Sequence, residues 1–283
     1  MFYTVRRANV PGLNGAEWVH GSPIGIATSP DGATWTYAGV AKIHYPDAVS
    51  DPTWWAPAVV YHQGLYHMYL TYVPGVFSNW SHPRHLLHLT STDLINWQYE
   101  STLPLEHAKD IDAGVLRVAD GTWRLWYKDE MNGSSTHYAD SPDLSHWTDR
   151  GRVEGLSDKN GEAPLPFHWK GHYWFLRDIA TGLALYRSDD ATAWKRIGTL
   201  LAEPGTGPDD KAVGKHPDVI ISGGRAYLYY FTHPGIAKDG ADGRDPRRTS
   251  LQVAELQYDS PTQTITCDRN RPVVIDLQPL MQL

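Results

Sequence analysis

The sequence predicts an all-β protein, a five-bladed β-propeller in which residues 1–283 form one domain. The first observation is a motif, Ser-x-Asp-x-x-x-Trp, which begins at residues 29, 91, 141 and 188. Repeats of this length with strand-like content are typical of propeller blades, each a four-stranded sheet. The second observation is a hairpin pattern that accompanies the motif. The third is that no Pro/Ser-rich linker or block of charge divides the chain, and single β domains often exceed about 200 residues.

The hairpin pattern consists of an apolar strand, a tight turn on glycine and a strand rich in aromatic residues. It occurs at residues 56–72, 113–129, 163–178 and 218–231, with turns on Gly64, Gly121, Gly171 and Gly224. A third strand and the motif then lead into an outer strand, as in 182–188 and 194–201. Blades 2 to 5 therefore begin near residues 54, 110, 160 and 214. Blade 5 lacks the motif, and we expect its third and fourth strands at 250–258 and 272–276.

The repeated motif is predicted to be structural. Ser and Asp side chains cap turns by accepting hydrogen bonds from nearby backbone N–H groups. The Trp that closes the motif is suited to burial between neighbouring blades. The motif therefore counts blades and does not mark the functional site.

Blade 1 departs from the pattern. Its third strand is expected at 23–29, and its second strand at residues 1–5, but no first strand precedes that segment. We expect either that the chain is truncated or that another segment takes the innermost place. An unpaired edge strand also favours a homodimer or an exchanged strand.

Composition excludes several classes of function. The net charge of −7 and the absence of Lys/Arg runs argue against nucleic acid as a partner. The lone Cys267 excludes an intrachain disulfide framework and a Cys-based zinc site. No apolar run approaches the roughly 18 residues of a membrane span. No signal peptide is visible, and localisation stays open with a slight preference for the cytoplasm. The 12 Trp and 16 Tyr suit either a sugar-binding cleft or a Trp-rich core.

Innermost propeller strands converge on the central axis, so the residues that begin them line one funnel. Counting nine residues back from each turn glycine gives Trp55, Asp112, Glu162 and Lys215, with His216 beside the last. Two carboxylates from different blades therefore fall at one register. A carboxylate that heads a buried strand is costly unless it is paired or used, so we favour a functional role for this set.

Paired carboxylates around an aromatic-lined funnel indicate glycoside hydrolysis, in which one carboxylic acid protonates the leaving oxygen. Four short segments then carry a resemblance: "WWAPAVV" (54–60), "IDAGVL" (111–116), "GEAPLPF" (161–167) and "GKHPDVI" (214–220). Together with the blade order, they resemble the landmarks of glycoside hydrolase family 43 and its five-bladed relatives, families 32, 68 and 117.

The resemblance implies roles for individual residues. Glu162 would be the general acid, with a pKa raised by nearby Asp112 and by partial burial. Asp112 would orient that acid, with Asp110 as the second choice. His216 would lie near the axis, where family members hold calcium or its waters, and a satisfied core histidine is the alternative.

The family's catalytic base is an Asp that heads the first strand of blade 1, which this sequence does not contain. Asp218 lies near the correct end of blade 5 but three residues deeper, so it is a poor substitute for this base and is expected to contact substrate. Asp47 and Asp51, in the loop that enters blade 2, are further candidates without specific support.

Other residues could contact a substrate. Trp54 and Trp55 could form a stacking wall for a sugar ring, with blade packing as an equal alternative. Lys128 and Arg177 end second strands, where loop salt bridges are the favoured alternative. His82, His85 and His88 have a conceivable metal spacing, but we favour a loop that shapes the pocket. The Gly-rich loop 235–248 is expected to rim the pocket.

The sequence therefore predicts an inverting glycosidase that removes a terminal pentose-like or furanose residue from an oligo- or polysaccharide. Inversion requires the two carboxyl groups to lie about 6.5–9.5 Å apart. Loops 7–22 and 73–85 would close one side of the cleft into a pocket. Two alternatives stay open: a catalytically inactive propeller that binds glycan through Trp55, and a family 117-like glycosidase with a different acid, in some members a His.

Overall fold

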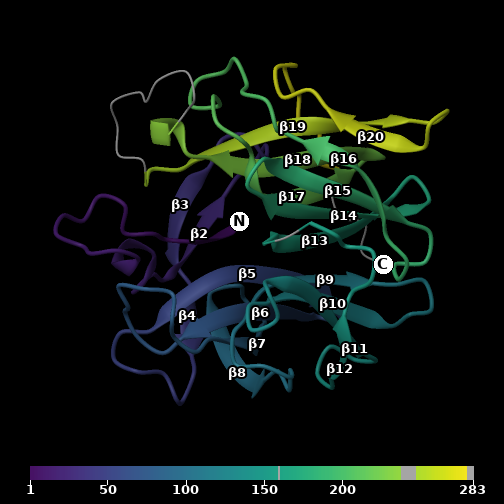
Figure 1. Ribbon diagram of the computed structural model, residues 1–283. Helices are drawn as coiled ribbons and strands as arrows, with labels where there is room; N and C mark the ends of the chain where they lie inside the picture. The colour runs from purple at the N-terminus through teal and green to yellow at the C-terminus, as the bar shows by residue number, and fades with distance from the viewer. Residues whose placement is uncertain (159, 237–246, 279–283) are drawn as a thin grey trace.

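The computed structural model describes residues 1–158, 160–236 and 247–278, and five β-sheets account for nearly all of its regular structure. Figure 1 shows the sheets arranged as the blades of a propeller around the N-terminus. Two short 3-10 turns, η1 (Glu17–Val19) and η2 (Pro234–Ile236), are the other regular elements within this part of the chain. No helix in the described ranges has the length and apolar character to span a membrane. Residues 237–246, from the loop expected to rim the pocket, lie outside the described residues.

Blades 3, 4 and 5 are four-stranded antiparallel sheets in which each strand pairs with the next along the chain. Blade 3 contains β9 (Asp110–Arg117), β10 (Trp123–Asp129), β11 (Ser135–Ser141) and β12 (Thr148–Arg152). Blade 4 contains β13 (Glu162–Trp169), β14 (His172–Ile179), β15 (Gly182–Ser188) and β16 (Lys195–Leu200). Blade 5 contains β17 (Lys215–Ser222), β18 (Arg225–Thr232), β19 (Ser250–Asp259) and β20 (Thr264–Cys267). The predicted all-β propeller is confirmed.

Blade 2 has a fifth strand that the sequence analysis did not predict. Its four expected strands are β5 (Thr53–His62), β6 (Leu65–Val73), β7 (His85–Ser91) and β8 (Asn96–Thr102). The short β4 (Lys42–His44) adds to the outer edge, where it pairs in parallel with β8. β4 covers that edge as the chain passes from blade 1 to blade 2.

Blade 1 contains three strands, β1 (Phe2–Thr4), β2 (Ile24–Thr28) and β3 (Thr36–Val40), in that order. β1 pairs with β2 alone, so its inner edge faces the middle of the ring without a strand partner among the described residues. The expectation that blade 1 lacks its innermost strand is confirmed. Met1 to Thr4 consequently line the central cavity.

The predicted fourth strand of blade 5 was wrong. We expected it at 272–276, whereas the hairpin partner of β19 is β20. A tight turn after Asp259 brings β20 onto β19 at once, so the edge is occupied before residue 272 is reached. Residues 272–278 cross toward the inner strands instead. There the backbone N–H of Asp276 donates to Tyr227 Oη of β18 (3.0 Å), and that of Gln278 donates to Ser222 Oγ of β17 (2.7 Å).

The motif that counts the blades caps a turn, as predicted. In the copy that begins at Ser91, the Ser hydroxyl oxygen accepts the N–H of Leu94 at 2.9 Å. Asp93 Oδ1 accepts the N–H groups of Ile95 and Asn96, both at 2.8 Å. Leu94 takes the left-handed conformation (φ 64°), which these side-chain hydrogen bonds hold in place.

The Trp of each motif packs against the preceding blade. Their ring centroids lie 5.7 Å apart for Trp97 and Phe2, 5.3 Å for Trp147 and Tyr69, 6.2 Å for Trp194 and Trp126, and 6.2 Å for Trp35 and Tyr229. The last pair joins blade 1 to blade 5 and so closes the ring. The predicted burial of these rings between blades is confirmed at Trp97, Trp147 and Trp194, while Trp35 is half-buried.

Candidate active site

Each of the four inner strands is irregular near its start. The pairing of β5 with β6 shifts between Trp55 and Ala58, and β9, β13 and β17 show similar breaks. At the break stands a residue with positive φ that is not glycine: Ala56 (47°), Asp112 (57°), Ala163 (47°) and His216 (41°). Such bulges bend a strand and redirect its side chains, and strained backbone of this kind clusters at functional sites.

The pairing corrects the predicted register. Glu162 pairs with Asp178, Lys215 with Phe231 and Trp55 with Thr71, but the residue of β9 at this level is Ile111, which pairs with Lys128. Asp112 therefore aligns with Ala163, one residue deeper than Glu162. The turn of blade 3 is one residue longer than the others, so counting back from its glycine misplaced Asp112 by one position.

A central cavity of about 1000 Å³ lies at this bulged end of the strands. Its lining includes Trp55, Asp112, Glu162, His216 and Asp218, which the sequence analysis singled out. The lining also includes Arg6, Trp80, Arg84 and Glu130, which it did not assign to the site. This volume is in the range of a site for a small molecule or sugar.

Glu162 lies at the head of β13 with its side chain 43% exposed to the cavity. Lys128 Nζ donates to Glu162 Oε1 at 2.7 Å, and His216 Nε2 lies 3.6 Å from Oε2. Burial alone would raise the pKa of Glu162, but the hydrogen bond with His216 and the charge of Lys128 outweigh it and hold the pKa well below its usual range. The expected raised pKa was therefore wrong for the ligand-free protein.

Asp112 is almost completely buried and acts on Glu162 through the backbone. Its Oδ2 accepts the N–H of Ala163 at 3.1 Å, the amide that directly follows Glu162. The N–H of Asp112 itself donates to Thr71 Oγ1 of blade 2 at 3.2 Å. Burial raises the pKa of Asp112, and the charge of Glu162 adds to that effect against the opposing charges of His216 and Lys128. Asp112 thus ties three blades together behind Glu162.

Lys128 belongs to a chain of alternating charges. It lies at the end of β10, buried, and donates to Glu130 Oε1 at 2.8 Å as well as to Glu162. Glu130 also pairs with Arg84, whose side chain is buried in turn. Burial lowers the pKa of Lys128, but the charges of Glu162 and Glu130 more than compensate and raise it. Lys128 is therefore a fixed cation that contacts Glu162; it is not part of the cavity lining.

His216 lies between two carboxylates. Its Nε2 is 3.6 Å from Glu162 Oε2 and 3.7 Å from Asp178 Oδ2, and its backbone N–H donates to Asp178 Oδ2 at 3.2 Å. The imidazole stacks on Phe231, with ring centroids 5.4 Å apart. Burial would lower the pKa of His216, but the hydrogen bond with Glu162 and the charges of Asp178 and Asp112 raise it. We conclude that His216 is held toward its protonated form.

The residues around His216 do not fit a calcium ion. Lys128 and Lys215 already neutralise the two carboxylates nearest the imidazole, because Lys215 Nζ lies 3.2 Å from Asp178. Across the described ranges, no group of three or more His, Cys, Asp or Glu side chains is arranged to hold a metal. The expected metal role of His216 therefore finds no support in its surroundings.

The aromatic wall of the cavity comes from Trp55 and from Trp80 of loop 73–85, with Val19 of loop 7–22 beside them. Trp55 Nε1 donates to Val19 O at 2.8 Å, which fixes the ring against the first loop. Trp80 faces it with ring centroids 6.1 Å apart and is 57% exposed. Behind them His20 and His82 share a hydrogen bond of 3.0 Å. His88 lies elsewhere, stacked on Tyr69 in the core, so the three His of the conceivable metal spacing do not meet.

Several residues expected near the substrate lie outside the cavity. Trp54 is only 7% exposed and packs on Tyr72 in the core, so the packing alternative holds and the stacking role was wrong. Arg177 is 1% exposed and donates to the carbonyls of Asp158 and Gly161, which braces the loop before Glu162. Arg177 therefore supports the loop that leads to Glu162 and lies outside the cavity.

The other candidate carboxylates also differ in whether they line the cavity. Asp47 and Asp51 are exposed on the loop that enters blade 2 and do not line the cavity. Asp110 is 2% exposed, and burial together with the charges of Asp129 and Asp149 raises its pKa to about 8. Its Oδ1 has no hydrogen-bond partner among the residues that the structure describes. Asp218 lines the cavity and is exposed to it.

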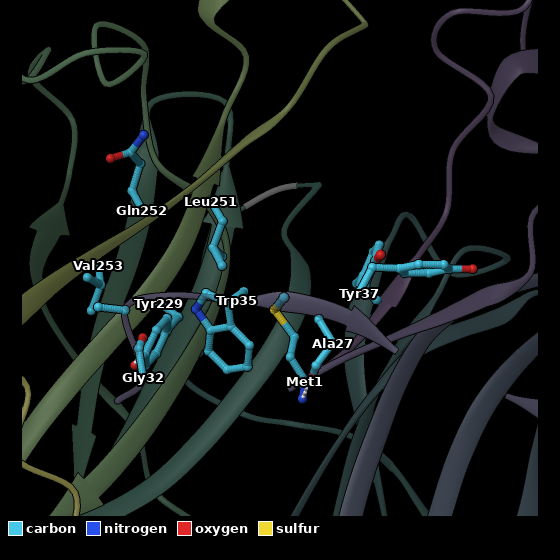
Figure 2. Close-up of a pocket in the computed structure, with 11 residues that line it drawn as sticks. Met1, Ala27, Gly32, Trp35, Tyr37, Tyr229, Leu251, Gln252 and Val253 are labelled. Atoms are coloured by element: carbon cyan, nitrogen blue, oxygen red, sulfur yellow. Dashed lines mark hydrogen bonds between the residues drawn. The ribbon is translucent and has the colours of Figure 1, made fainter. Parts of the chain in front are cut away.

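A second, smaller cavity of about 480 Å³ lies between blades 1 and 5 (Figure 2). Trp35, Met1 and Tyr229 converge there, with Leu251 above them. Its lining contains no Asp, Glu, His, Lys or Arg, so it lacks the paired carboxylates that glycoside hydrolysis requires. The candidate carboxylates line the central cavity.

Comparison with known proteins agrees with this geometry. No protein-family model matches the sequence. A fructan β-fructosidase from Streptococcus mutans is 26% identical over 159 residues, which are 48% of this chain and only 11% of that much longer protein. The chain is also similar to the solved structure of RS223-β-xylosidase, with a TM-score of 0.67, 14% identity and coverage of 93% of this chain and 90% of the other.

A further similar structure is a β-xylosidase/α-arabinofuranosidase of glycoside hydrolase family 43 from a compost microbial metagenome, in complex with xylotriose and in a calcium-free form. The TM-score is 0.66 at 15% identity, with 93% of this chain and 88% of the other covered. At these identities the likeness establishes the fold alone, a five-bladed β-propeller.

Proposed function

We propose that this protein is a glycoside hydrolase that removes a terminal pentose-like or furanose residue from a glycan. The observation that carries the proposal is Glu162, which heads a bulged inner strand in a cavity walled by Trp55 and Trp80. Asp112 holds the amide that follows Glu162 and so fixes where the carboxyl group points. The names of the similar proteins, a fructosidase and two xylosidases, support a furanose or pentose as the sugar.

Glu162 is proposed as the general acid. In the ligand-free protein Lys128 and His216 favour its ionised form. A sugar bound against the half-exposed carboxyl group would remove water from it, which favours the protonated form. The acid would then deliver its proton to the leaving oxygen as the glycosidic bond breaks.

Asp218 is proposed as the base that activates water. Of the carboxylates in the lining, Asp112 accepts the Ala163 amide, Glu130 is paired with Arg84 and Lys128, and Glu162 is the acid. Asp218 is exposed to the cavity and belongs to a different blade from Glu162. An acid and a base on opposite faces of the sugar would invert the configuration at the anomeric carbon.

The test is hydrolysis of aryl arabinofuranoside, xyloside, galactofuranoside and galactoside, together with sucrose, by the native protein and by Glu162→Gln. We expect one of these to be cleaved and the variant to lose at least about 100-fold in kcat. Glu154→Gln, which changes an exposed residue outside the cavity, is the matched control and should keep full activity. Cleavage that survives in Glu162→Gln contradicts the assignment of the acid.

Two alternative functions are each favoured by one contact of Glu162. His216 touches Glu162, so a His acid of the family 117 kind would show as loss of activity in His216→Gln with retention in Glu162→Gln. The pairing of Glu162 with Lys128 also favours a glycan-binding propeller without activity. That reading predicts saturable sugar binding and no hydrolysis of any substrate in the panel.

A further inference from the structure

Arg6 differs from the other cations around the cavity. Arg84, Lys128 and Lys215 each lie within ion-pair distance of a carboxylate. Arg6 lines the cavity, is half-buried, and makes no hydrogen bond or ion pair with any residue in the described ranges. A charge taken out of water without a partner is costly, so its retention here calls for a ligand that supplies one.

Two aromatic rings hold the guanidinium. Its central carbon lies 5.7 Å from the ring centroid of Trp18, in loop 7–22, and 5.3 Å from that of Phe231, at the end of β18. Cation–π contacts of this kind fix the plane of the group. Because these contacts involve ring systems and no hydrogen bond, all five N–H donors of Arg6 stay available.

Arg6 also lines the same cavity as Glu162 and His216. Burial lowers the pKa of Arg6, and the charges of Glu162, Asp112 and Asp178 oppose this effect only in part. Phe231 contacts both Arg6 and His216, so the two cations lie on the same side of the funnel. A group bound to Arg6 would therefore be close to a sugar placed at Glu162.

We propose that Arg6 binds the carboxylate of an acidic sugar, so that the glycan accepted carries a uronate beside the terminal residue held against Glu162. This inference rests on the proposed function and names its substrate class. A planar guanidinium fork matches a planar carboxylate with two parallel hydrogen bonds. Free phosphate also binds Arg, but the neighbouring cations that would complete a phosphate site are already paired.

The experiment compares binding of D-galacturonate with binding of D-galactose, which differ at one carbon, by calorimetry on the full chain. We expect the native protein to bind the uronate about tenfold to 100-fold more tightly, as two charge-assisted hydrogen bonds imply. Arg6→Gln should bring the two affinities within about twofold of each other. Arg117→Gln is the control, because Arg117 also lies over a Trp ring but outside the cavity.

Arg6→Lys provides a second variant should Arg6→Gln fold poorly. It keeps the charge but loses the fork, so an intermediate preference is expected. Equal affinities in the native protein, or a preference that survives in Arg6→Gln, would overturn the inference. A titration with inorganic phosphate tests the alternative ligand. If phosphate binds as tightly as the uronate and loses that affinity in Arg6→Gln, the assignment of Arg6 to an acidic sugar is overturned. The calorimetric test measures binding and needs no hydrolysis. Failure to cleave any substrate in the panel would therefore contradict the proposed function and leave the uronate inference untouched.

Discussion

Lys128 Nζ and Glu162 Oε1 lie 2.7 Å apart, and this contact joins the second strand of blade 3 to the first strand of blade 4. It places a buried ammonium on the carboxyl group that we propose as the acid. The contact therefore favours the ionised form of the candidate acid, and we expect it to influence the pH dependence of the proposed reaction.

Lys128→Met should move the alkaline limb of the kcat/KM profile to higher pH. A general acid works only while protonated, and the charge of Lys128 lowers the pKa of Glu162. Removal of an adjacent opposite charge typically raises a carboxyl pKa by about one to three units. The pH–rate profiles of the native protein, Lys128→Met and the exposed control Lys195→Met would measure the shift. Superimposable profiles would show that Lys128 does not act on the acid.

Asp110→Asn should stabilise the protein, and more so as pH rises. Burial raises the folded-state pKa of Asp110 to about 8, above its unfolded value of about 4. Between these values the folded state keeps a proton that the unfolded state has released. The free energy of unfolding of the native protein therefore falls by up to about 1.4 kcal/mol per pH unit across that window.

The neutral amide of Asp110→Asn removes this dependence, so its advantage over the native protein should grow from pH 5 to pH 8. Urea unfolding at intervals of one pH unit, with the exposed Asp51→Asn as control, measures it. A constant difference between Asp110→Asn and the native protein at all pH values would contradict the prediction.

Trp55 and Trp54 are adjacent but should respond in opposite ways. Trp55→Ala removes a wall of the cavity, so we expect sugar affinity to fall about fivefold to tenfold with a small change in stability. Trp54→Ala removes a core ring and should lower the free energy of unfolding by about 3–5 kcal/mol. Sugar titration and urea unfolding of both variants separate the two roles. Equal loss of affinity in both would place Trp54 at the site after all.

Gly114→Ala should destabilise the ring where blades 3 and 4 meet. A Cβ at Gly114 would come within 2.0 Å of the carbonyl oxygen of Pro164, so one inner strand has to move. Overpacking of this kind costs about 1–3 kcal/mol or more. Gly198→Ala is the control, since a Cβ there has no neighbour within 4 Å. The urea midpoint should fall in Gly114→Ala and stay at the native value in Gly198→Ala; equal midpoints in the two variants would contradict the prediction.

Calcium should leave the protein unchanged. Lys128 and Lys215 already neutralise the carboxylates beside His216. We expect the thermal midpoint and the activity to be the same with calcium chloride as with a chelator. A saturable stabilisation by calcium that disappears in His216→Gln would establish the metal site that the sequence analysis expected.

The sequence by itself determined the blades. Each Ser-x-Asp-x-x-x-Trp turn closes within seven residues, and glycine hairpins such as the one at Gly171 are equally local. Local patterns of this kind are legible because the atoms that satisfy one another are close along the chain. They also located Glu162 and His216 at the funnel, since the distance from a hairpin turn to the strand start is nearly constant.

Tertiary structure decided how those residues behave. The register of Asp112 in β9 depends on one extra residue in the turn of blade 3. The identity of the last strand of blade 5 depends on which segment pairs with the edge of β19. The pKa of Glu162 depends on Lys128, 34 residues away along the chain, and Arg6 stands out only because the other cations found partners. Electrostatic effects change steeply over a few ångströms, and distances between blades are set by the packing of the whole ring.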